Sequence, residues 1–311
     1  MGESQAIDLS QVADKLGLKT HQVVGVMSLL EDGNTVPFIT RDRKEQTGNL
    51  NETQIRDIAQ RVDLLRQLAE RAAAVLRLIE TQGKLTPELQ AAIAEAGTLK
   101  RLEDIYLPYR PKRSSRASQA RERGLQPLAD RIWNDDSALG PLEAAARDFV
   151  DPAQNLPGTA EVLQGVGDII VERISDSADL RERVRRLAWS TGRLSVSVTK
   201  TGEEQGQEYR NYFDYNDAIS RIPPHRVLAI NRGEEASALR VKFECDRPRI
   251  ERTVADYFEF SRRHQTEFLT RCATDAVARL ILPSLQREFR RELSERAERH
   301  AVDVFAENLR H

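Results

Sequence analysis

The strongest concentration of one charge in this sequence lies between residues 110 and 123, and its chemistry would be the binding of anions. Six cations stand there against a single acid, Glu122: Arg110, Lys112, Arg113, Arg116, Arg121 and Arg123. Guanidinium and ammonium groups bind phosphate through charge-assisted hydrogen bonds, so a nucleic-acid backbone is one ligand that fits. The protein's own carboxylates, or the acidic face of a protein partner, are the alternative.

The candidate nucleic-acid-binding residues are most of this cluster and the residues that precede it. They are Lys100, Arg101, Tyr109, Arg110, Lys112, Arg113, Arg116 and Arg121. Pro108 and Pro111 disfavour a helical conformation in the residue before each of them. We therefore expect a short helix over residues 99–106, followed by a cationic loop.

Sequence signatures of catalysis and of metal binding are absent. The histidines are scattered, with no HExxH motif and no Cys/His zinc spacing: His21, His225, His264, His300 and His311. There is no GxxxxGKS or GxxxxGKT phosphate loop and no GxSxG nucleophile elbow. We therefore predict a protein that is not an enzyme, with no catalytic residue, no metal site and no cofactor.

Composition limits the class of protein. The 311 residues are 31% charged and 5% aromatic, a balance typical of helical surfaces. The formal net charge of −2 argues against a chain that binds nucleic acid over its whole surface. Cys245 and Cys272 do not make a disulfide scaffold and fit a reducing compartment. No signal peptide and no run of about 18 apolar residues occurs, so we expect a cytoplasmic protein without a membrane partner.

Two short amphipathic helices separated by Gly17 form a helix-turn-helix pattern over residues 8–32. If this unit read DNA, Lys19, His21 and Gln22 would lie in the groove. Residues 1–33 carry two lysines against five acids, and non-specific DNA affinity comes mainly from neutralised phosphates. We therefore favour a packing or protein-contact role for this unit over direct DNA reading.

A long helix with a heptad pattern is predicted from Glu52 to Gln82, with Asn51 as its cap and Gln54 as the capping-box partner. Its apolar residues alternate three and four positions apart: Ile55, Ile58, Val62, Leu65, Ala69, Ala72, Leu76 and Ile79. An intermolecular coiled coil and a hairpin within the chain both fit this pattern. A second helix that opens at Pro87 favours the hairpin.

The second half of the chain mixes helical and extended patterns. Residues 226–231 and 238–244 predict a small β-hairpin, and residues 194–199 are either one arm of a hairpin or an irregular segment. Tyr209–Tyr215 holds four aromatic residues and Arg210, which would stack on bases or pack as core, and we favour the core. Gly165 and Gly167 lie within a predicted helix and indicate close packing.

Apolar helical stripes continue to the end of the chain, with an interruption expected at Pro283. The last helix, from Ser284, reaches His311 without a stop signal, which suggests a truncated chain. The sequence as a whole predicts a mainly α fold. This fold is a multi-helical array with the helix-turn-helix-like unit, the heptad-patterned helix and the small β-hairpin near 226–244. We expect two domains, residues 1–205 and residues 206–311, the second leading to a missing C-terminal half.

Several motifs occur in order along the chain and carry a family resemblance. They are Thr35–Ile39 with Arg43–Glu45 and Thr47–Gly48, Gln82–Pro87, Leu102–Tyr109 with Pro111–Arg113, Gly124–Leu125 with Pro127–Ala129, Tyr212–Tyr215, Ile222–Pro223 with His225–Arg226, Asn231–Glu234, and Phe305–Arg310. Together they resemble the Tex family of bacterial transcription accessory proteins. Asp42 and Asn49 depart from the family's usual residues, within one connector.

The resemblance implies a modular protein of more than twice this length, in which an RNase-H-like domain, a helix-hairpin-helix region and an OB-fold RNA-binding domain follow. It also implies a cytoplasmic protein linked to transcription and to nucleic acid. On that basis we expect a non-catalytic N-terminal scaffold that contributes to RNA or DNA binding, with the transcription machinery as a partner. The alternative is a protein-interaction scaffold, for RNA polymerase or another partner, that makes no nucleic-acid contact.

Overall fold

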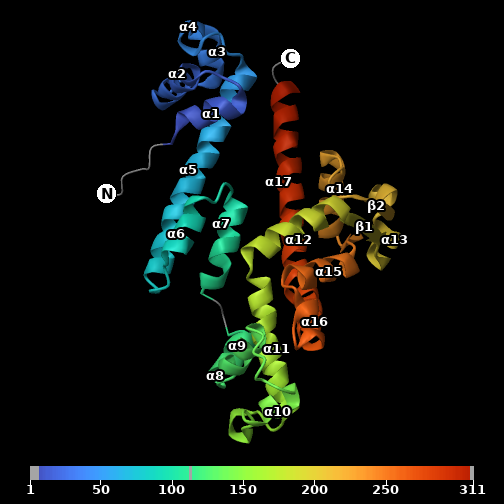
Figure 1. Ribbon diagram of the computed structural model, residues 1–311. Helices are drawn as coiled ribbons and strands as arrows, with labels where there is room; N and C mark the ends of the chain where they lie inside the picture. Colours follow the sequence, from blue (N-terminus) through green and yellow to red (C-terminus); the bar gives the residue numbers. More distant parts are fainter. Residues whose placement is uncertain (1–6, 112–113, 309–311) are drawn as a thin grey trace. The chain divides into compact units, whose positions relative to one another are not determined.

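The computed structural model describes residues 7–111 and 114–308, and over these residues the protein is mainly α-helical (Figure 1), as predicted. The chain divides into two compact units, Met1–Tyr109 and Arg110–His311. The domain boundary that we expect near residue 205 falls inside the second unit, and it stays a prediction. Among the described residues, no helix is both long enough and apolar enough to cross a membrane.

The first unit opens with four short helices around a small core. They are α1 (Leu9–Leu16), α2 (Thr20–Glu31), α3 (Val36–Asp42) and α4 (Lys44–Thr47). Gly17 has a φ of +64°, a left-handed conformation that glycine adopts without strain, and this lets the chain turn from α1 into α2. Two helices joined by a tight turn therefore lie within residues 8–32, and the helix-turn-helix assignment of this unit stays a prediction. Its apolar faces bury Val12, Val23 and Val26 together with Ile39 of α3.

A long helix joins this core to a second group of helices in the first unit. These are α5 (Glu52–Glu80), α6 (Pro87–Ala94), α7 (Leu99–Tyr106) and the short 3-10 helix η1 (Leu107–Tyr109). The predicted capping box is present, because the backbone N–H of Gln54 donates to Asn51 Oδ1 at 2.9 Å and that of Asn51 donates to Gln54 Oε1 at 3.0 Å. α5 packs against both α6 and α7, and Arg71 pairs with Glu103 at 2.6 Å. The contacts of the long helix thus lie within the chain, as the hairpin interpretation predicted.

The second unit is built around α11 (Thr159–Ser175). Before it come α8 (Arg116–Glu122), α9 (Gln126–Trp133), α10 (Leu142–Arg147) and the 3-10 helix η2 (Pro152–Gln154), and after it comes α12 (Ala178–Thr191). α8, α9, α10 and α16 (Thr266–Asp275) all pack against α11. α11 is therefore buried along much of its length, at Val162, Val166, Ile169 and Ile170 among others.

A three-stranded antiparallel sheet follows, with β1 (Arg193–Val198) between β2 (Asp214–Ala218) and β3 (Leu239–Glu244). Val196 of β1 stands opposite Tyr215 on one side and Val241 on the other. Between β1 and β2 lie α13 (Lys200–Gln205) and the 3-10 helix η3 (Gln207–Tyr212). The aromatic residues of 209–215 pack against the core, as the favoured interpretation predicted.

The predicted β-hairpin at 226–244 is wrong in its first arm. Residues 226–231 lie in α14 (Pro224–Glu235), and only the second arm forms a strand, β3, which pairs with β1. Pro224 at the start of α14 has a fixed φ suited to a first helical turn. Val227 and Ile230 are buried three residues apart, which is a helical spacing, so this short apolar run satisfies the helical period as well as it suits a strand.

The interruption expected at Pro283 is also wrong. After α15 (Arg247–Tyr257) and the 3-10 helix η4 (Phe260–Arg262), α16 continues through a π-helical turn, η5 (Ala276–Ile281), into α17 (Leu282–Asn308). Proline lacks the N–H that an α-helix needs for its bond to the carbonyl four residues earlier. A π turn directly before Pro283 has already departed from that bonding pattern, so the proline fits within a continuous helical segment.

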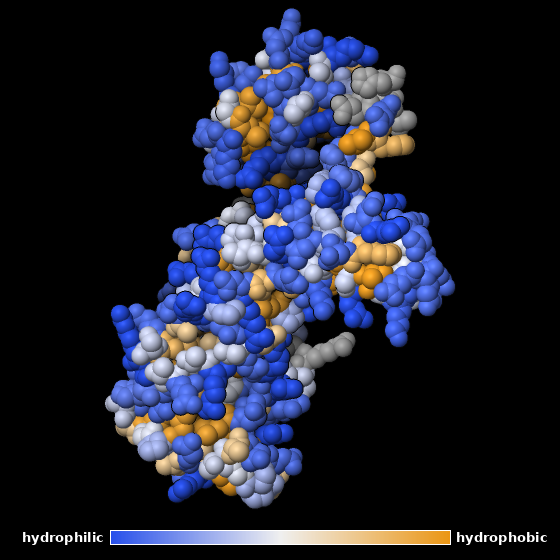
Figure 2. Space-filling view, turned by 90° about the vertical axis from the view of Figure 1, so that its right-hand side faces the viewer, coloured by the Kyte–Doolittle hydropathy of each residue, from blue (hydrophilic) through white to orange (hydrophobic). Residues whose placement is uncertain are grey.

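The surface is mostly polar. On the face shown in Figure 2, hydrophilic residues predominate and hydrophobic residues gather in small separate patches. Large exposed apolar side chains include Val302 and Phe305 near the end of α17, which are 66% and 64% exposed.

Candidate nucleic-acid interface

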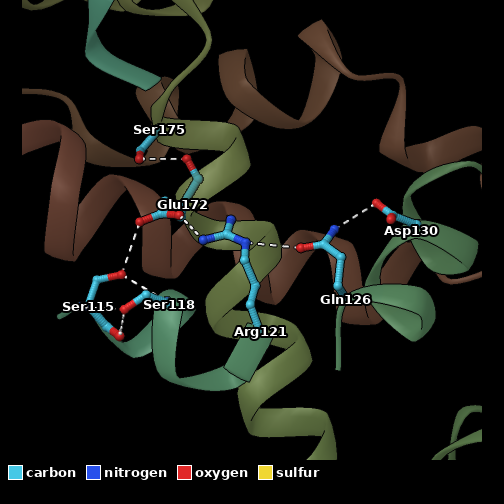
Figure 3. Close-up of polar contacts among 7 residues, drawn as sticks. All are labelled: Ser115, Ser118, Arg121, Gln126, Asp130, Glu172 and Ser175. Carbon is cyan, nitrogen blue, oxygen red and sulfur yellow. Dashed lines mark hydrogen bonds and ion pairs between the residues drawn. The ribbon is translucent and has the colours of Figure 1, made fainter. Parts of the chain in front are cut away.

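A polar network holds α8 against α11 (Figure 3). Arg121 Nη1 donates to Glu172 Oε2 at 2.6 Å, and the hydroxyl of Ser115 donates to Glu172 Oε1 at 3.2 Å. Arg121 also donates from Nε to Gln126 Oε1 at 3.0 Å. Glu172 is 8% exposed, so this carboxylate needs its partners in order to stay charged inside the protein. Arg121 is therefore a structural cation whose charge is met by the protein's own acid.

Arg116 differs from Arg121, although both belong to α8. It is exposed, and its side chain makes no ion pair or hydrogen bond with any residue that the structure describes. It lines a groove of about 680 Å³ along α11, together with Arg271, whose guanidinium lies 5.8 Å from the centre of the Phe268 ring. Glu143 lines the same groove. A free guanidinium is thus available to an anion beside the anchored helix.

The remaining candidates of the basic segment, residues 100–121, are divided between the two units and the residues that the structure does not describe. Lys112 and Arg113 lie outside the described residues. Lys100, Arg101 and Tyr109 belong to the first unit, and the carbonyl of Tyr109 accepts a hydrogen bond from Gln82 at 2.9 Å. Lys100 and Arg101, and also Arg110 of the second unit, each interact with other groups of the protein.

Of the three helix-turn-helix candidates, the structure engages Gln22 in hydrogen bonds within the protein and leaves Lys19 and His21 exposed. Gln22 closes a capping box by accepting from the backbone N–H of Lys19 at 3.0 Å, and its amide donates to the carbonyl of Gly48 at 3.2 Å. Its side chain is therefore engaged in joining α2 to the end of α4. Lys19 and His21 are exposed at the start of α2.

Sequence reasoning missed Glu172. This residue lies between Val171 and Arg173 on α11, and a glutamate gives no signal of burial by its residue type. Its role follows only from the packing of α8 on α11.

The chemistry of the titratable groups does not point to a nucleophile. Burial raises the pKa of the Cys272 thiol to about 12, so the reactive thiolate is scarce near neutral pH. Burial also raises the pKa of Cys245. Within residues 7–111 and 114–308, no three or more His, Cys, Asp and Glu residues are grouped so that they could hold a metal ion.

Comparison with known proteins gives matches along the chain. The family model "Tex central region-like" matches residues 136–305, and "Tex-like protein N-terminal domain" matches residues 7–80. The chain is 38% identical to "Protein tex" of Bordetella pertussis over 323 residues, which is 99% of this chain and 41% of that protein. It is 36% identical to "Transcriptional accessory protein Tex" of Neisseria gonorrhoeae over 307 residues, 96% of this chain and 40% of that protein.

A human relative is more distant. The chain is 28% identical to the human "S1 RNA-binding domain-containing protein 1" over 323 residues, 97% of this chain and 32% of that protein. The chain spans about two fifths of the length of the bacterial relatives that it matches.

Proposed function

The chain belongs to the Tex family, and we propose that it is a non-catalytic scaffold of a Tex-like transcription accessory protein that contributes to nucleic-acid binding. The names of two relatives, one a transcriptional accessory protein and one an S1 RNA-binding domain-containing protein, support an association with transcription and with RNA. In this role the protein works in the cytoplasm beside the transcription machinery.

The observation that carries the proposal is the contrast between Arg116 and Arg121. The pair of Arg121 with Glu172 fixes α8, while Arg116 on the same helix makes no ion pair or hydrogen bond with the residues that the structure describes. An anchored helix holds a free cation in place at little entropic cost when a phosphate binds. Lys112 and Arg113 precede it by a few residues in the sequence and add positive charge to this segment.

The test measures binding of single-stranded RNA and of duplex DNA by fluorescence anisotropy, at low and at moderate salt. Arg116→Glu should weaken binding several-fold and flatten the dependence of log K on log salt by about 0.7 to 0.9 for the lost phosphate contact. Arg113→Glu with Arg116→Glu should flatten it further. Arg77→Glu, at an exposed arginine of α5, changes the net charge equally and is the control. If the wild-type chain binds neither nucleic acid at low salt, the proposal fails.

A protein-interaction scaffold is the second candidate, and one observation favours it. Arg121 is neutralised inside the protein, and Lys100, Arg101 and Arg110 also have interactions within the chain. A basic segment whose cations interact with groups of the same chain stabilises the fold and has fewer cations available to bind an anion. Unchanged nucleic-acid binding after Arg116→Glu would support this candidate over the first.

A further inference from the structure

A second group of arginines lies outside the basic segment, between α12 and α15. These two helices lie side by side (Figure 1) and pack against one another. The guanidinium of Arg183, near the start of α12, lies 5.2 Å from the centre of the ring of Tyr257, at the end of α15. Arg186 lies three residues after Arg183 on α12, and Arg249 and Arg252 lie three residues apart on α15, so each pair shares one side of its helix. We call these four residues the α12–α15 arginine surface.

The arginines of α12 divide between its two sides. Arg185 on the α17 side donates from Nε to Glu288 at 2.7 Å, and both side chains are largely buried. Arg181 on the same side donates to the hydroxyl of Ser284 at 3.1 Å. Successive residues of a helix are about 100° apart, so Arg183 and Arg186 project from a different side. Among the described residues, the arginines of α12 that face α17 are thus engaged, and Arg183 and Arg186 have no ion pair.

The charges of the four arginines of the surface are not offset by ion pairs that the structure describes. All four are exposed, and none makes an ion pair with a residue that the structure describes. The other arginine of α15, Arg247, is already paired with Glu251 at 2.7 Å. Asp256 is the exposed acid of α15 that is left to offset them. With Asp179 and Glu182 of α12 included, the two helices hold seven arginines against four acids, a local excess of positive charge in a chain of net charge −2.

An aromatic cluster adjoins one end of the surface. Tyr257 contacts Phe258 with ring centres 4.8 Å apart, and Phe258 contacts Trp133 at 5.0 Å. All three rings are partly buried, and Arg173 lies 4.8 Å from the centre of the Trp133 ring. Contact with a ring positions a guanidinium without neutralising it, because the ring carries no net charge. The N–H donors of Arg183 therefore stay available for an anion.

We propose that the α12–α15 arginine surface binds the backbone of single-stranded nucleic acid, with the cluster of Tyr257, Phe258 and Trp133 next to the bound bases. A cationic track beside aromatic side chains is the combination that binds single strands, since phosphates meet cations and bases meet rings. The surface shares no residue with the basic segment at 100–121. This inference rests on the proposed function, because it names a second surface for nucleic acid, but it does not depend on Arg116.

The test measures, by fluorescence anisotropy, the binding of the whole 311-residue chain to a labelled single-stranded RNA and, for comparison, to duplex DNA of the same length. Arg183→Glu with Arg186→Glu should weaken single-strand binding about tenfold and flatten the salt dependence by about 1.4, the value for two lost phosphate contacts. Arg77→Glu with Arg147→Glu alters the net charge by the same amount at exposed arginines of α5 and α10, and it should leave binding nearly unchanged. Circular dichroism of each variant checks that its helices are intact, and Arg183→Gln with Arg186→Gln should give a smaller loss in the same direction.

A second readout places the ligand. The chain has two tryptophans, and Trp189→Phe leaves Trp133 as the only one while keeping a ring against Phe289. Single-stranded RNA should then change the fluorescence of Trp133, and this change should disappear in the Arg183→Glu, Arg186→Glu background.

The outcomes separate the two proposals. If Arg116→Glu weakens binding and the α12–α15 variants do not, this inference is overturned and the proposed function stands. The reverse result supports this surface and removes the basic segment from the interface. Equal losses in the control pair, a preference for duplex DNA, or an unchanged Trp133 signal would each contradict a single-strand site here.

Discussion

Glu172 shows at the scale of single residues how this protein uses its charges. Its carboxylate is buried between α8 and α11 and accepts hydrogen bonds from Arg121 and Ser115. Arg185 and Glu288 form a similar pair between α12 and α17. Such pairs fix the position of one helix on another. They add little net stability, because each charge loses its water on burial.

Removing one member of the Glu172 pair should therefore cost more than removing both. Arg121→Met removes the ion pair of a buried carboxylate and should lower the free energy of unfolding by about 1–3 kcal/mol. Urea unfolding followed by circular dichroism measures this change.

The double variant Arg121→Met with Glu172→Gln is the control, because the amide carries no charge that needs a partner. It should recover part of the loss. A double variant that is less stable than the sum of the two single variants would contradict this account of the network.

At the scale of elements, α11 depends on close approach by its neighbours. A Cβ at Gly165 would lie 2.5 Å from Leu125 Cδ1 and 3.3 Å from Ala120 Cβ, so α8 and the turn into α9 come too near for a side chain. A Cβ at Gly167 would meet its nearest atoms, Cys272 Sγ and Phe268 Cζ, at 3.7 Å, which is ordinary contact. The two glycines are two residues apart on one helix and differ in what surrounds them.

The glycines provide a matched pair of variants. Gly165→Ala should lower the free energy of unfolding by about 1–3 kcal/mol, because Leu125 must repack inside the core. Gly167→Ala should be neutral or raise it by about 0.5–1 kcal/mol, since alanine favours a helix interior. Thermal and urea unfolding of both variants measure the difference. Equal effects at the two positions would show that helix propensity, rather than contact with α8, decides.

Sequence reasoning succeeded where local chemistry decides the outcome. The cap of α5 at Asn51 and the buried positions Ile55, Ile58, Val62 and Ile79 follow from side-chain type and spacing alone. At Leu76 the structure buries Val75 instead, because the second half of α5 meets different partners, α6 and α7.

The predictions from the sequence were wrong or incomplete where contacts between distant residues decide between two local structures. The apolar residues at 226–231 suit both a helix and a strand. In the structure they form part of α14, and β3 pairs with β1 rather than with residues 226–231. The basic segment was visible in the sequence. Among the described residues, Arg121 is paired and Arg116 is not. This difference depends on Glu172, which lies 51 residues after Arg121 and is brought near by packing. The α12–α15 arginine surface likewise needs two helices far apart in sequence.

At the scale of the whole molecule, the chain contains separate hydrophobic cores. One core includes residues between Val12 and Val62, and the other includes residues between Ala117 and Ala297. The two compact units meet in sequence at Tyr109 and Arg110, and each core lies within one unit. A core of this kind is the usual condition for independent folding.

We therefore expect the piece 110–311, expressed alone, to fold cooperatively with a helical circular dichroism spectrum. It contains Arg116 and all of the α12–α15 arginine surface, so it should keep most of the single-strand affinity of the whole chain. Anisotropy titrations of both proteins measure this. A piece that is unfolded, or folded without affinity, would show that the first unit is needed for the stability or the binding of the second.

The π-helical turn at Ala276–Ile281 has a consequence for the evolution of this chain. Such a turn holds about one residue more than an α-helical turn, and each residue advances a helix by about 100°. Leu285, Phe289 and Leu293 of α17 are buried in the core, so their direction from the helix axis already includes the rotation that the extra residue adds. Deleting one residue from this turn would rotate these three side chains away from the core and toward solvent. Many substitutions at exposed positions of α17 would change the stability of the protein little. We expect homologous chains to differ by substitutions along this helix and to keep its length unchanged.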